Sequence, residues 1–233
     1  MTMQLKILAI IPARGGSKRI PRKNIRPFRG KPIIGWSIEA ALASKLFNSV
    51  MVSTDDPEIS QIAKSFGADV PFMRSAKTSD DFATTADVLL EVLNHYSQNS
   101  QAFDLACCIY PTAPFVTPEA LAKGMVFLLE QNFDAVFPVA RFSYSIWRSL
   151  KMSDAGQVSL NFPNNLNARS QDLPAAFHDA GQWYWFHVPA FLCMKTLIGA
   201  NSGAIELSSD IVQDIDTLED WTLAELKHER IMT

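Results

Sequence analysis

The chain has 233 residues, of which 48% are hydrophobic and 19% are charged, and its formal net charge is −3. This composition is typical of a globular protein with a sizeable core, and it disfavours a general nucleic-acid-binding protein, which would need an extended basic face. No apolar run approaches the ~18 residues of a membrane-spanning helix. The first apolar run is short and is followed by cations, the reverse of a secretory signal. The cysteines Cys107, Cys108 and Cys193 lack metal-binding spacing and indicate reduced thiols, so we expect a cytoplasmic protein.

The first half of the chain alternates short apolar runs with helical patterns. Asp55-Asp56-Pro57-Glu58 predicts the start of one helix, because an aspartate can cap it and proline suits its first position. The order of strand, helix, strand and helix predicts a parallel sheet with right-handed crossovers. The predicted strands are 7–11, 50–54, 70–72 and 104–110, and the predicted helices are 31–47, 55–67 and 86–98.

The second half continues this alternation around one interruption. Thr117 precedes one predicted helix, and Thr217 with Asp220 predicts a capping box at the start of the last one. No repeat or low-complexity linker divides the chain, so we expect a single domain over residues 1–233. The predicted helices are 117–131, a short one opened by Pro189, and 217–230, and the predicted strands are 134–140, 181–187 and 211–215.

Residues 141–170 form the interruption and read as an excursion from the α/β core. An aromatic stretch from Phe142 to Leu150 alternates with polar residues, Gly156 provides a turn, and residues 157–160 can return as the second strand of a hairpin. One interpretation is a β-insertion that covers a sheet edge. The other is a subunit interface, which the aromatic residues favour because such residues are enriched in interfaces.

The loop after the first strand concentrates positive charge. It contains Gly15 and Gly16 together with Arg14, Lys18, Arg19, Arg22 and Lys23. Residues 1–38 hold nine Lys or Arg and no acid, whereas the rest of the chain has 21 − 9 = 12 Lys or Arg against 24 Asp or Glu. A glycine-bearing cationic loop between a strand and a helix is typical of a phosphate site. A solvated basic loop is the alternative, and neither the Walker A nor the dinucleotide motif is present.

Asp214 and Asp216 form the second candidate constellation. Two residues apart on the predicted strand 211–215, their carboxylates would share a face near its carboxyl end. Such a pair can bind Mg²⁺ through oxygen ligands. The alternative is a solvated turn whose acids cap the following helix.

The run from Ile11 to Asn24, IPARGGSKRIPRKN, resembles the nucleotide-binding signature of the CMP-sialic acid synthetase family, the cytidylyltransferases that activate nonulosonic acids. The resemblance extends over nearly the whole chain, and HDAGQ, QDIDT and Tyr110 are most similar to its pseudaminic acid branch. The further motifs are VSTDD at 52–56, PTAP at 111–114, RSQD at 169–172, HDAGQ at 178–182 and QDIDT at 213–217.

This resemblance implies a Rossmann-like nucleotidyltransferase fold, an α/β architecture of three layers with a mostly parallel twisted sheet between helices. It implies a CTP-dependent enzyme that attaches CMP to a nine-carbon 2-keto sugar acid and releases pyrophosphate. Tyr110 and His178 differ from the Gln and Arg that sialic acid relatives tend to have, which favours a nonulosonate other than N-acetylneuraminate. Pseudaminic acid is the expected acceptor, with N-acetylneuraminate or legionaminate as the alternative. A sugar-1-phosphate nucleotidyltransferase and a catalytically silent nucleotide-binding protein are the competing hypotheses.

The resemblance also implies site residues, a divalent cation, a homodimer and no nucleic-acid or membrane partner. Arg14, Lys18 and Lys23 would bind the triphosphate, and Asp214 and Asp216 would hold Mg²⁺, so these five are the predicted catalytic residues. The relatives pair through an excursion such as 141–170. The other predicted CTP contacts are Ala13, Gly15, Gly16, Ser17, Asn24, Arg74 and Thr85, with Thr84 as the alternative to Thr85. The predicted sugar-acid contacts are Tyr110, Arg169 for the carboxylate, Gln171, His178, Asp179 and Gln182.

Overall fold

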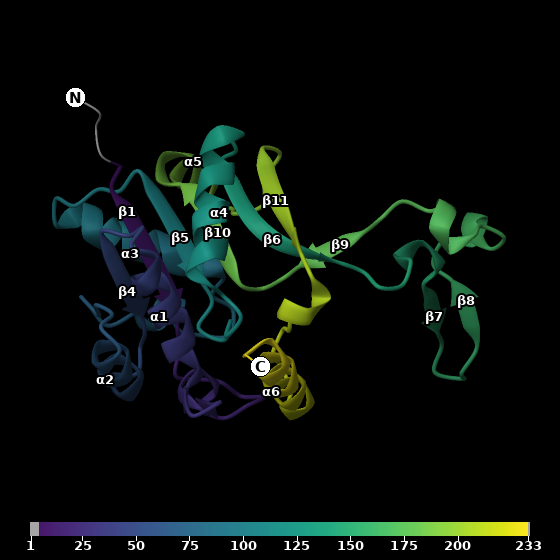
Figure 1. The fold of residues 1–233 in the computed structure, drawn as a ribbon, viewed down its shortest axis with the longest axis horizontal. Helices are drawn as coiled ribbons and strands as arrows, with labels where there is room; N and C mark the ends of the chain where they lie inside the picture. The colour runs from purple at the N-terminus through teal and green to yellow at the C-terminus, as the bar shows by residue number, and fades with distance from the viewer. Residues whose placement is uncertain (1–4, 233) are drawn as a thin grey trace.

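A seven-stranded sheet forms the centre of the computed structural model, which describes residues 5–232 (Figure 1). Residues 1–4 and Thr233, the two ends of the predicted single domain, lie outside the described residues. The strands are ordered β11-β6-β10-β5-β1-β4, and β9 pairs with β6. Their bounds are β1 Ile7–Pro12, β4 Ser49–Ser53, β5 Leu105–Ile109, β6 Ala135–Arg141, β9 Phe177–Asp179, β10 Trp183–His187 and β11 Ser202–Leu207.

The sheet is mixed but mostly parallel in its core. Strand β1 pairs parallel with β4 and β5, and β11 pairs parallel with β6, whereas β10 lies antiparallel between β5 and β6. Helices connect the parallel strands, as predicted for an α/β sheet. Their bounds are α1 Ile33–Ser44, α2 Pro57–Ser65, α3 Thr85–Gln98, α4 Pro118–Glu130, α5 Val188–Met194 and α6 Leu218–Met232.

Helices cover both faces of the sheet, as the α/β prediction required. Residues Ile7–Ile11 are all buried, and alternate residues enter different clusters because successive strand side chains point to opposite faces. Ile11 packs in the cluster that contains residues of α1, α2 and α4. Ile10 packs in the cluster of α3 and α5. Because both faces are covered, β1 reads as a continuous apolar run, and the three-layer fold class is confirmed.

Helix caps account for several of the predicted boundaries. Asp56 accepts hydrogen bonds from the backbone N–H groups of Glu58 and Ile59, so α2 begins where the sequence predicts. Thr117 caps α4 through the N–H of Ala120. Near the carboxyl end of the chain, Thr217 and Asp220 form the predicted capping box of α6. No helix among residues 5–232 combines the length and apolar character needed to cross a membrane.

Two predicted strands were wrong, and one predicted helix begins later than expected. The helix predicted from residue 31 begins at Ile33, because Lys31–Pro32 (β3) pairs with Pro27–Phe28 (β2). The predicted strand 70–72 is not a strand, since Pro71 has no N–H to donate, and only an isolated bridge joins Met51 to Asp69. The predicted strand 211–215 consists of a 3₁₀ turn and irregular chain, and the true last strand is β11.

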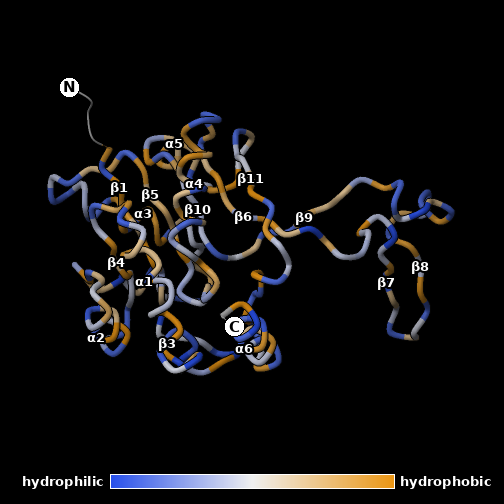
Figure 2. The backbone as a smooth tube through the Cα atoms, viewed as in Figure 1, coloured by the Kyte–Doolittle hydropathy of each residue, from blue (hydrophilic) through white to orange (hydrophobic). Residues whose placement is uncertain are grey.

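The excursion extends away from the sheet and carries a separate hairpin (Figure 1). Strands β7, Leu150–Met152, and β8, Val158–Leu160, pair antiparallel around the predicted turn, in which Gly156 has a φ of 79°. Figure 2 shows hydrophobic residues along both strands. Leu150, Met152 and Val158 are all more than half exposed. A two-stranded hairpin is only marginally stable alone in water, and this one exposes apolar side chains.

Helix α4 lies so close to β10 that a glycine is required at their contact. A Cβ on Gly124 would lie 2.6 Å from the ring of Trp183 and 2.7 Å from that of Trp185, both fully buried. We expect Gly124→Ala to lower the free energy of unfolding by about 1–3 kcal/mol through overpacking. Gly16→Ala is the matched control in thermal unfolding, because a Cβ there meets nothing within 4 Å. Equal melting temperatures for the two variants would contradict this account of the contact.

Candidate functional site

The basic loop leaves β1 at Pro12 and is held against the start of α2. The N–H of Gly15 donates to Asp55 Oδ1 at 2.9 Å, and a Cβ on Gly15 would lie 2.7 Å from Asp56 Oδ2. Glycine is therefore required for this close approach. Arg22 has a left-handed φ of 58° and forms ion pairs with Asp56 and Glu58. Arg22 thus fixes the shape of the loop.

Acidic side chains lie on both sides of the remaining cations. On one side, Arg14 Nη1 donates to the carbonyl of Asp80 at 2.8 Å and to Asp81 at 3.0 Å, and Lys18 pairs with the same Asp81. On the other side, Arg19 contacts Asp216 at 2.7 Å. These pairs are exposed to solvent, so each contributes little to stability, and an anion can displace them.

Lys23 joins the basic loop to the late acidic segment. Its Nζ donates to the carbonyl of Ile215 at 2.6 Å and lies 3.6 Å from Asp216 Oδ1. The two segments are 192 residues apart in sequence, yet they meet beyond the carboxyl end of β1. Ligands in open α/β sheets bind at this end of the strands.

A cavity of about 460 Å³ lies beside the basic loop and collects most of the predicted nucleotide contacts. Arg74 lines this cavity. It is buried and donates hydrogen bonds to both the hydroxyl and the carbonyl of Ser53. Burial lowers the pKa of the Arg74 guanidinium, and the nearby Asp55 opposes this shift. The predicted residues that line the cavity are Arg14, Ser17, Lys18, Lys23, Asn24, Arg74, Thr84, Thr85 and Tyr110.

Uncharged side chains of this cavity also have partners within the chain. Asn24 Nδ2 donates to the carbonyl of Arg14 at 2.9 Å and so supports the loop. Thr84 is engaged in the capping box of α3 with Asp87. The hydroxyl of Thr85 instead lies 3.1 Å from that of Tyr110, at the wall of the cavity.

A second cavity, also of about 460 Å³, lies on the far side of Asp216. It is lined by Asp214, Asp216, His178 and Lys227 among others. The side chain of Asp214 is accessible to water, yet the surrounding protein removes enough hydration to raise the pKa of its carboxyl, and the charge of Asp216 raises it further. Lys23 opposes that shift. Loss of hydration and the neighbouring charge of Asp216 therefore both disfavour the ionised form of Asp214.

The chemistry of this pair fits a divalent cation that is shared with a ligand. Within residues 5–232 no three His, Cys, Asp or Glu side chains are grouped so as to hold a metal by themselves. Mg²⁺ usually takes one or two carboxylates and completes its shell with water and phosphate oxygens. Asp214 and Asp216 supply two such ligands beside a cationic loop suited to phosphate.

The predicted sugar-acid residues separate into three groups. Tyr110 lines the first cavity and His178 the second. Asp179 and Gln182 are hydrogen-bonded within their own chain: exposed Asp179 accepts from Tyr184 Oη at 2.7 Å, and buried Gln182 donates to the carbonyl of Ile211 at 2.6 Å.

Arg169 lies at the end of the excursion, and Gln171 follows it directly. Arg169 pairs with Asp172 at 2.7 Å, and neither Arg169 nor Gln171 lines the two cavities described above. The structure therefore does not bring these two predicted contacts to the site of their own chain. Their function depends on what the excursion meets.

Sequence reasoning missed three residues of the site, namely Asp81, Tyr184 and Lys227. The ring of Tyr184 packs against that of Tyr110 in a tilted arrangement, 5.2 Å from centroid to centroid, and burial raises the pKa of the Tyr184 hydroxyl. The adjacent acids Asp80 and Asp81 in the polar loop before α3 were a visible signal. Nothing in the sequence indicates that Asp81 meets Lys18, because 63 residues separate them.

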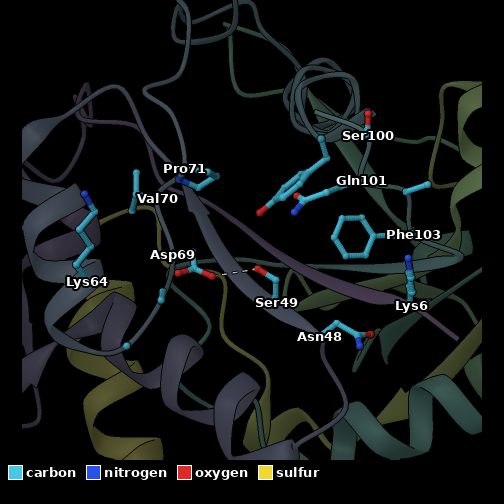
Figure 3. Close-up of a pocket in the computed structure, with 14 residues that line it drawn as sticks. Lys6, Asn48, Ser49, Lys64, Asp69, Val70, Pro71, Ser100, Gln101 and Phe103 are labelled. Atoms are coloured by element: carbon cyan, nitrogen blue, oxygen red, sulfur yellow. Dashed lines mark hydrogen bonds between the residues drawn. The ribbon is translucent and has the colours of Figure 1, made fainter. Parts of the chain in front are cut away.

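A larger cavity, of about 820 Å³, lies elsewhere (Figure 3). It opens at the amino ends of β1, β4 and β5, the opposite end of the sheet from the basic loop. Asp69, Ser49 and Phe103 line it, and the Ser49 hydroxyl donates to Asp69 at 3.2 Å. Volume alone would select this cavity. The convergence of cations, acids and polar groups instead selects the site around the basic loop.

Comparison with known proteins places the chain in a family. Residues 8–196 match the family described as cytidylyltransferase, which is most of the chain. The chain belongs to this cytidylyltransferase family. The matched part of this cytidylyltransferase includes the basic loop and ends before Asp214.

Individual relatives agree with the family assignment. The chain is 38% identical to the pseudaminic acid cytidylyltransferase of Campylobacter jejuni, over 95% of this chain and 96% of that protein. It is 35% identical to N-acylneuraminate cytidylyltransferase A of Danio rerio, over 94% of this chain and 50% of that protein. The solved structure of a CMP:2-keto-3-deoxy-manno-octonic acid synthetase complexed with CTP shares the fold, with a TM-score of 0.70 and 18% identity over 97% of this chain and 99% of that one.

Proposed function

We propose that this protein transfers CMP from CTP to a nine-carbon 2-keto sugar acid, with pseudaminic acid as the preferred acceptor, and releases pyrophosphate. The observation that carries the proposal is the contact of Lys23 and Arg19 with Asp216, because it unites a triphosphate-binding loop and a pair of acids in one site. The similarity to the Campylobacter jejuni enzyme over almost the full length of both chains supports the choice of acceptor.

The proposed reaction requires positioning and charge neutralisation by the residues of the site. The anomeric hydroxyl of the acceptor attacks the α-phosphorus of CTP, and the bond from that phosphorus to the oxygen bridging the β-phosphorus breaks. Arg14, Lys18 and Lys23 would offset the negative charge that develops on the phosphate oxygens. Asp214 and Asp216 would hold Mg²⁺, which supplies Lewis-acid neutralisation of phosphate charge when bound.

The cytosine base of CTP and the sugar-acid acceptor would occupy different cavities. Arg74 and Thr85 lie at the wall of the first cavity, where they can meet the edge of cytosine. His178 and Asp214 lie in the second cavity, which suits the acceptor because Asp216 separates it from the basic loop. Transfer would then occur at the boundary marked by Asp216.

The excursion supports a homodimer within this proposal. Its exposed apolar side chains, such as Leu150, Met152 and Val158, would be covered by a second copy. Arg169 and Gln171 could contact the acceptor only if the excursion of one protomer covers the second cavity of its partner. The use of CTP supports a cytoplasmic location for the proposed enzyme.

Pyrophosphate release with CTP, Mg²⁺ and a panel of acceptors tests the function. We expect turnover with pseudaminic acid to exceed that with N-acetylneuraminate and legionaminate, and mass spectrometry to show the CMP-sugar. Activity with a sugar 1-phosphate, or with UTP or GTP in preference to CTP, would overturn the proposal in favour of a sugar-1-phosphate nucleotidyltransferase. Bound CTP without pyrophosphate release from any acceptor would indicate a catalytically silent protein.

A further prediction concerns Asp81, which holds Arg14 and Lys18 before the nucleotide binds. A triphosphate must displace this carboxylate to reach both cations. We therefore expect Asp81→Asn to lower the Kd of CTP by about 2- to 5-fold, the effect typical of an exposed ion pair. Isothermal titration with CTP measures this, and Glu39→Gln, which removes an ion pair with Lys31 away from the site, is the control. Weaker CTP binding in Asp81→Asn would mean that Asp81 helps to bind the nucleotide.

A further inference from the structure

We propose that Lys227 and Gln182 are positioning residues that hold the segment 209–216 so that Asp214 and Asp216 face the basic loop. The inference rests on the proposed function for the role of the two acids. It goes beyond that function because neither Lys227 nor Gln182 needs to touch the nucleotide or the acceptor.

The segment needs such support because it has no strand neighbours. Residues 209–211 form a 3₁₀ turn, and the chain from Val212 to Asp216 is irregular. In a strand, the ladder would fix the carbonyl groups. Here, side-chain donors from three different parts of the fold replace the ladder, and each of them binds a main-chain carbonyl of the segment.

Lys227 binds the first half of the segment. Its Nζ donates to the carbonyl of Ser209 at 3.0 Å and to that of Val212 at 2.7 Å. Lys227 lies on α6, which begins immediately after the acidic segment at Leu218. The helix therefore folds back on the segment that precedes it, and Lys227 fixes the resulting turn.

Gln182 connects the segment to the nucleotide cavity. The side chain is 3% exposed, and its Nε2 donates to the carbonyl of Ile211 at 2.6 Å. Its main-chain carbonyl accepts from the N–H of Tyr110 at 2.8 Å. Gln182 thus links Tyr110, at the wall of the first cavity, to the turn that precedes Asp214 and Asp216. Lys23 binds the far end of the segment at Ile215.

Apolar contacts supplement these donors without fixing the direction of the acids. Val212 packs with Ala140 and Ala180, and Ile215 packs in the cluster that contains Phe28 and Trp221. These two buried residues hold the segment on the fold, whereas the hydrogen-bond donors fix its carbonyl groups and hence its rotation. Loss of a donor should therefore disturb the acids more than it disturbs the stability of the fold.

Lys227→Met and Gln182→Leu test the inference with two measurements that do not depend on turnover. Hydrogen exchange of the peptide covering residues 209–217 in the free protein should be faster in both variants. Mn²⁺ binding in the presence of CTP, followed by electron paramagnetic resonance, should weaken by about 10- to 100-fold, as for other residues that orient metal ligands. Lys227→Arg, which keeps a cationic donor, should recover most of the Mn²⁺ affinity.

Three outcomes separate the interpretations. Unchanged exchange of residues 209–217 in both variants would overturn the inference. Unchanged Mn²⁺ affinity with a raised KM for the acceptor would overturn it too, and would make these residues acceptor contacts. If the wild-type protein with CTP does not bind Mn²⁺, the metal part of the proposed function fails, and hydrogen exchange still decides whether Lys227 and Gln182 hold the segment. Thermal unfolding of each variant verifies that it is folded.

Discussion

Replacing Asp216 by asparagine is expected to lower kcat for CMP transfer by about 10²- to 10³-fold, the loss typical of removing one preorganised electrostatic group. Asp216 contacts Arg19 at 2.7 Å and Lys23 at 3.6 Å, and it lines the cavity that also contains Asp214. The amide keeps the size of the side chain but removes its charge. Pyrophosphate release at saturating CTP and acceptor measures the effect.

The control for this variant is Asp69→Asn. Asp69 is an exposed carboxylate that lines the large cavity at the amino ends of the strands, at the opposite end of the sheet. The Asp69→Asn variant should keep kcat within about 2-fold of the wild-type value, because surface substitutions generally have small effects. Turnover near the wild-type rate in Asp216→Asn would show that the late acids are a helix-capping turn and take no part in transfer.

Replacing Lys23 by methionine is expected to lower kcat/KM for CTP by about 10²- to 10³-fold. The change removes the hydrogen bond to Ile215 and the ion pair with Asp216, together with one of the cations that face the first cavity. Methionine retains most of the length of the lysine side chain, so packing is largely preserved. Steady-state kinetics with CTP varied at saturating acceptor give this value.

Lys64→Met is the matched control for Lys23→Met. Lys64 lies on α2 and lines the large cavity at the amino ends of the strands, so its removal changes the net charge equally without touching the basic loop. Equal losses in the two variants would show that the effect comes from net charge. A loss in kcat/KM confined to Lys23→Met is the expected result.

The sequence predicted the α/β core well because its signals are local. The buried strands are continuous apolar runs, and Asp56, Thr117 and Thr217 each mark a helix start through a hydrogen bond within three residues. Strand β11 was missed because its pattern is weak. Gly203 interrupts it, and glycine is required there because a Cβ would lie 2.4 Å from the ring of Phe133, which sequence alone does not reveal.

The candidate site could be predicted in part, and for a reason that was partly wrong. Asp214 and Asp216 were selected because a strand would place them on one face, yet the segment is irregular and is held by Lys227, Gln182 and Lys23. The partners of those donors are main-chain carbonyl groups, which every residue possesses, so no sequence pattern identifies them. Asp81 was missed for a related reason, since its cations lie far away in the sequence.

The excursion marks the limit of what one chain can specify. Its aromatic content and hairpin were visible in the sequence, and the structure confirms the turn at Gly156. Whether Arg169 meets an acceptor depends on a second molecule, because within its own chain it pairs with Asp172. Sedimentation of the wild-type chain would establish the oligomeric state that this part of the proposal requires.

The central claim is that the basic loop and the acidic pair form one site for a nucleoside triphosphate and a divalent cation. The most direct measurement is a crystal structure of the protein with CTP and Mn²⁺, in which anomalous scattering locates the metal. We predict one anomalous peak in contact with Asp214, Asp216 and a phosphate oxygen, with Arg14, Lys18 and Lys23 on the triphosphate. A peak at other residues, or CTP bound away from the loop 13–24, would contradict the claim.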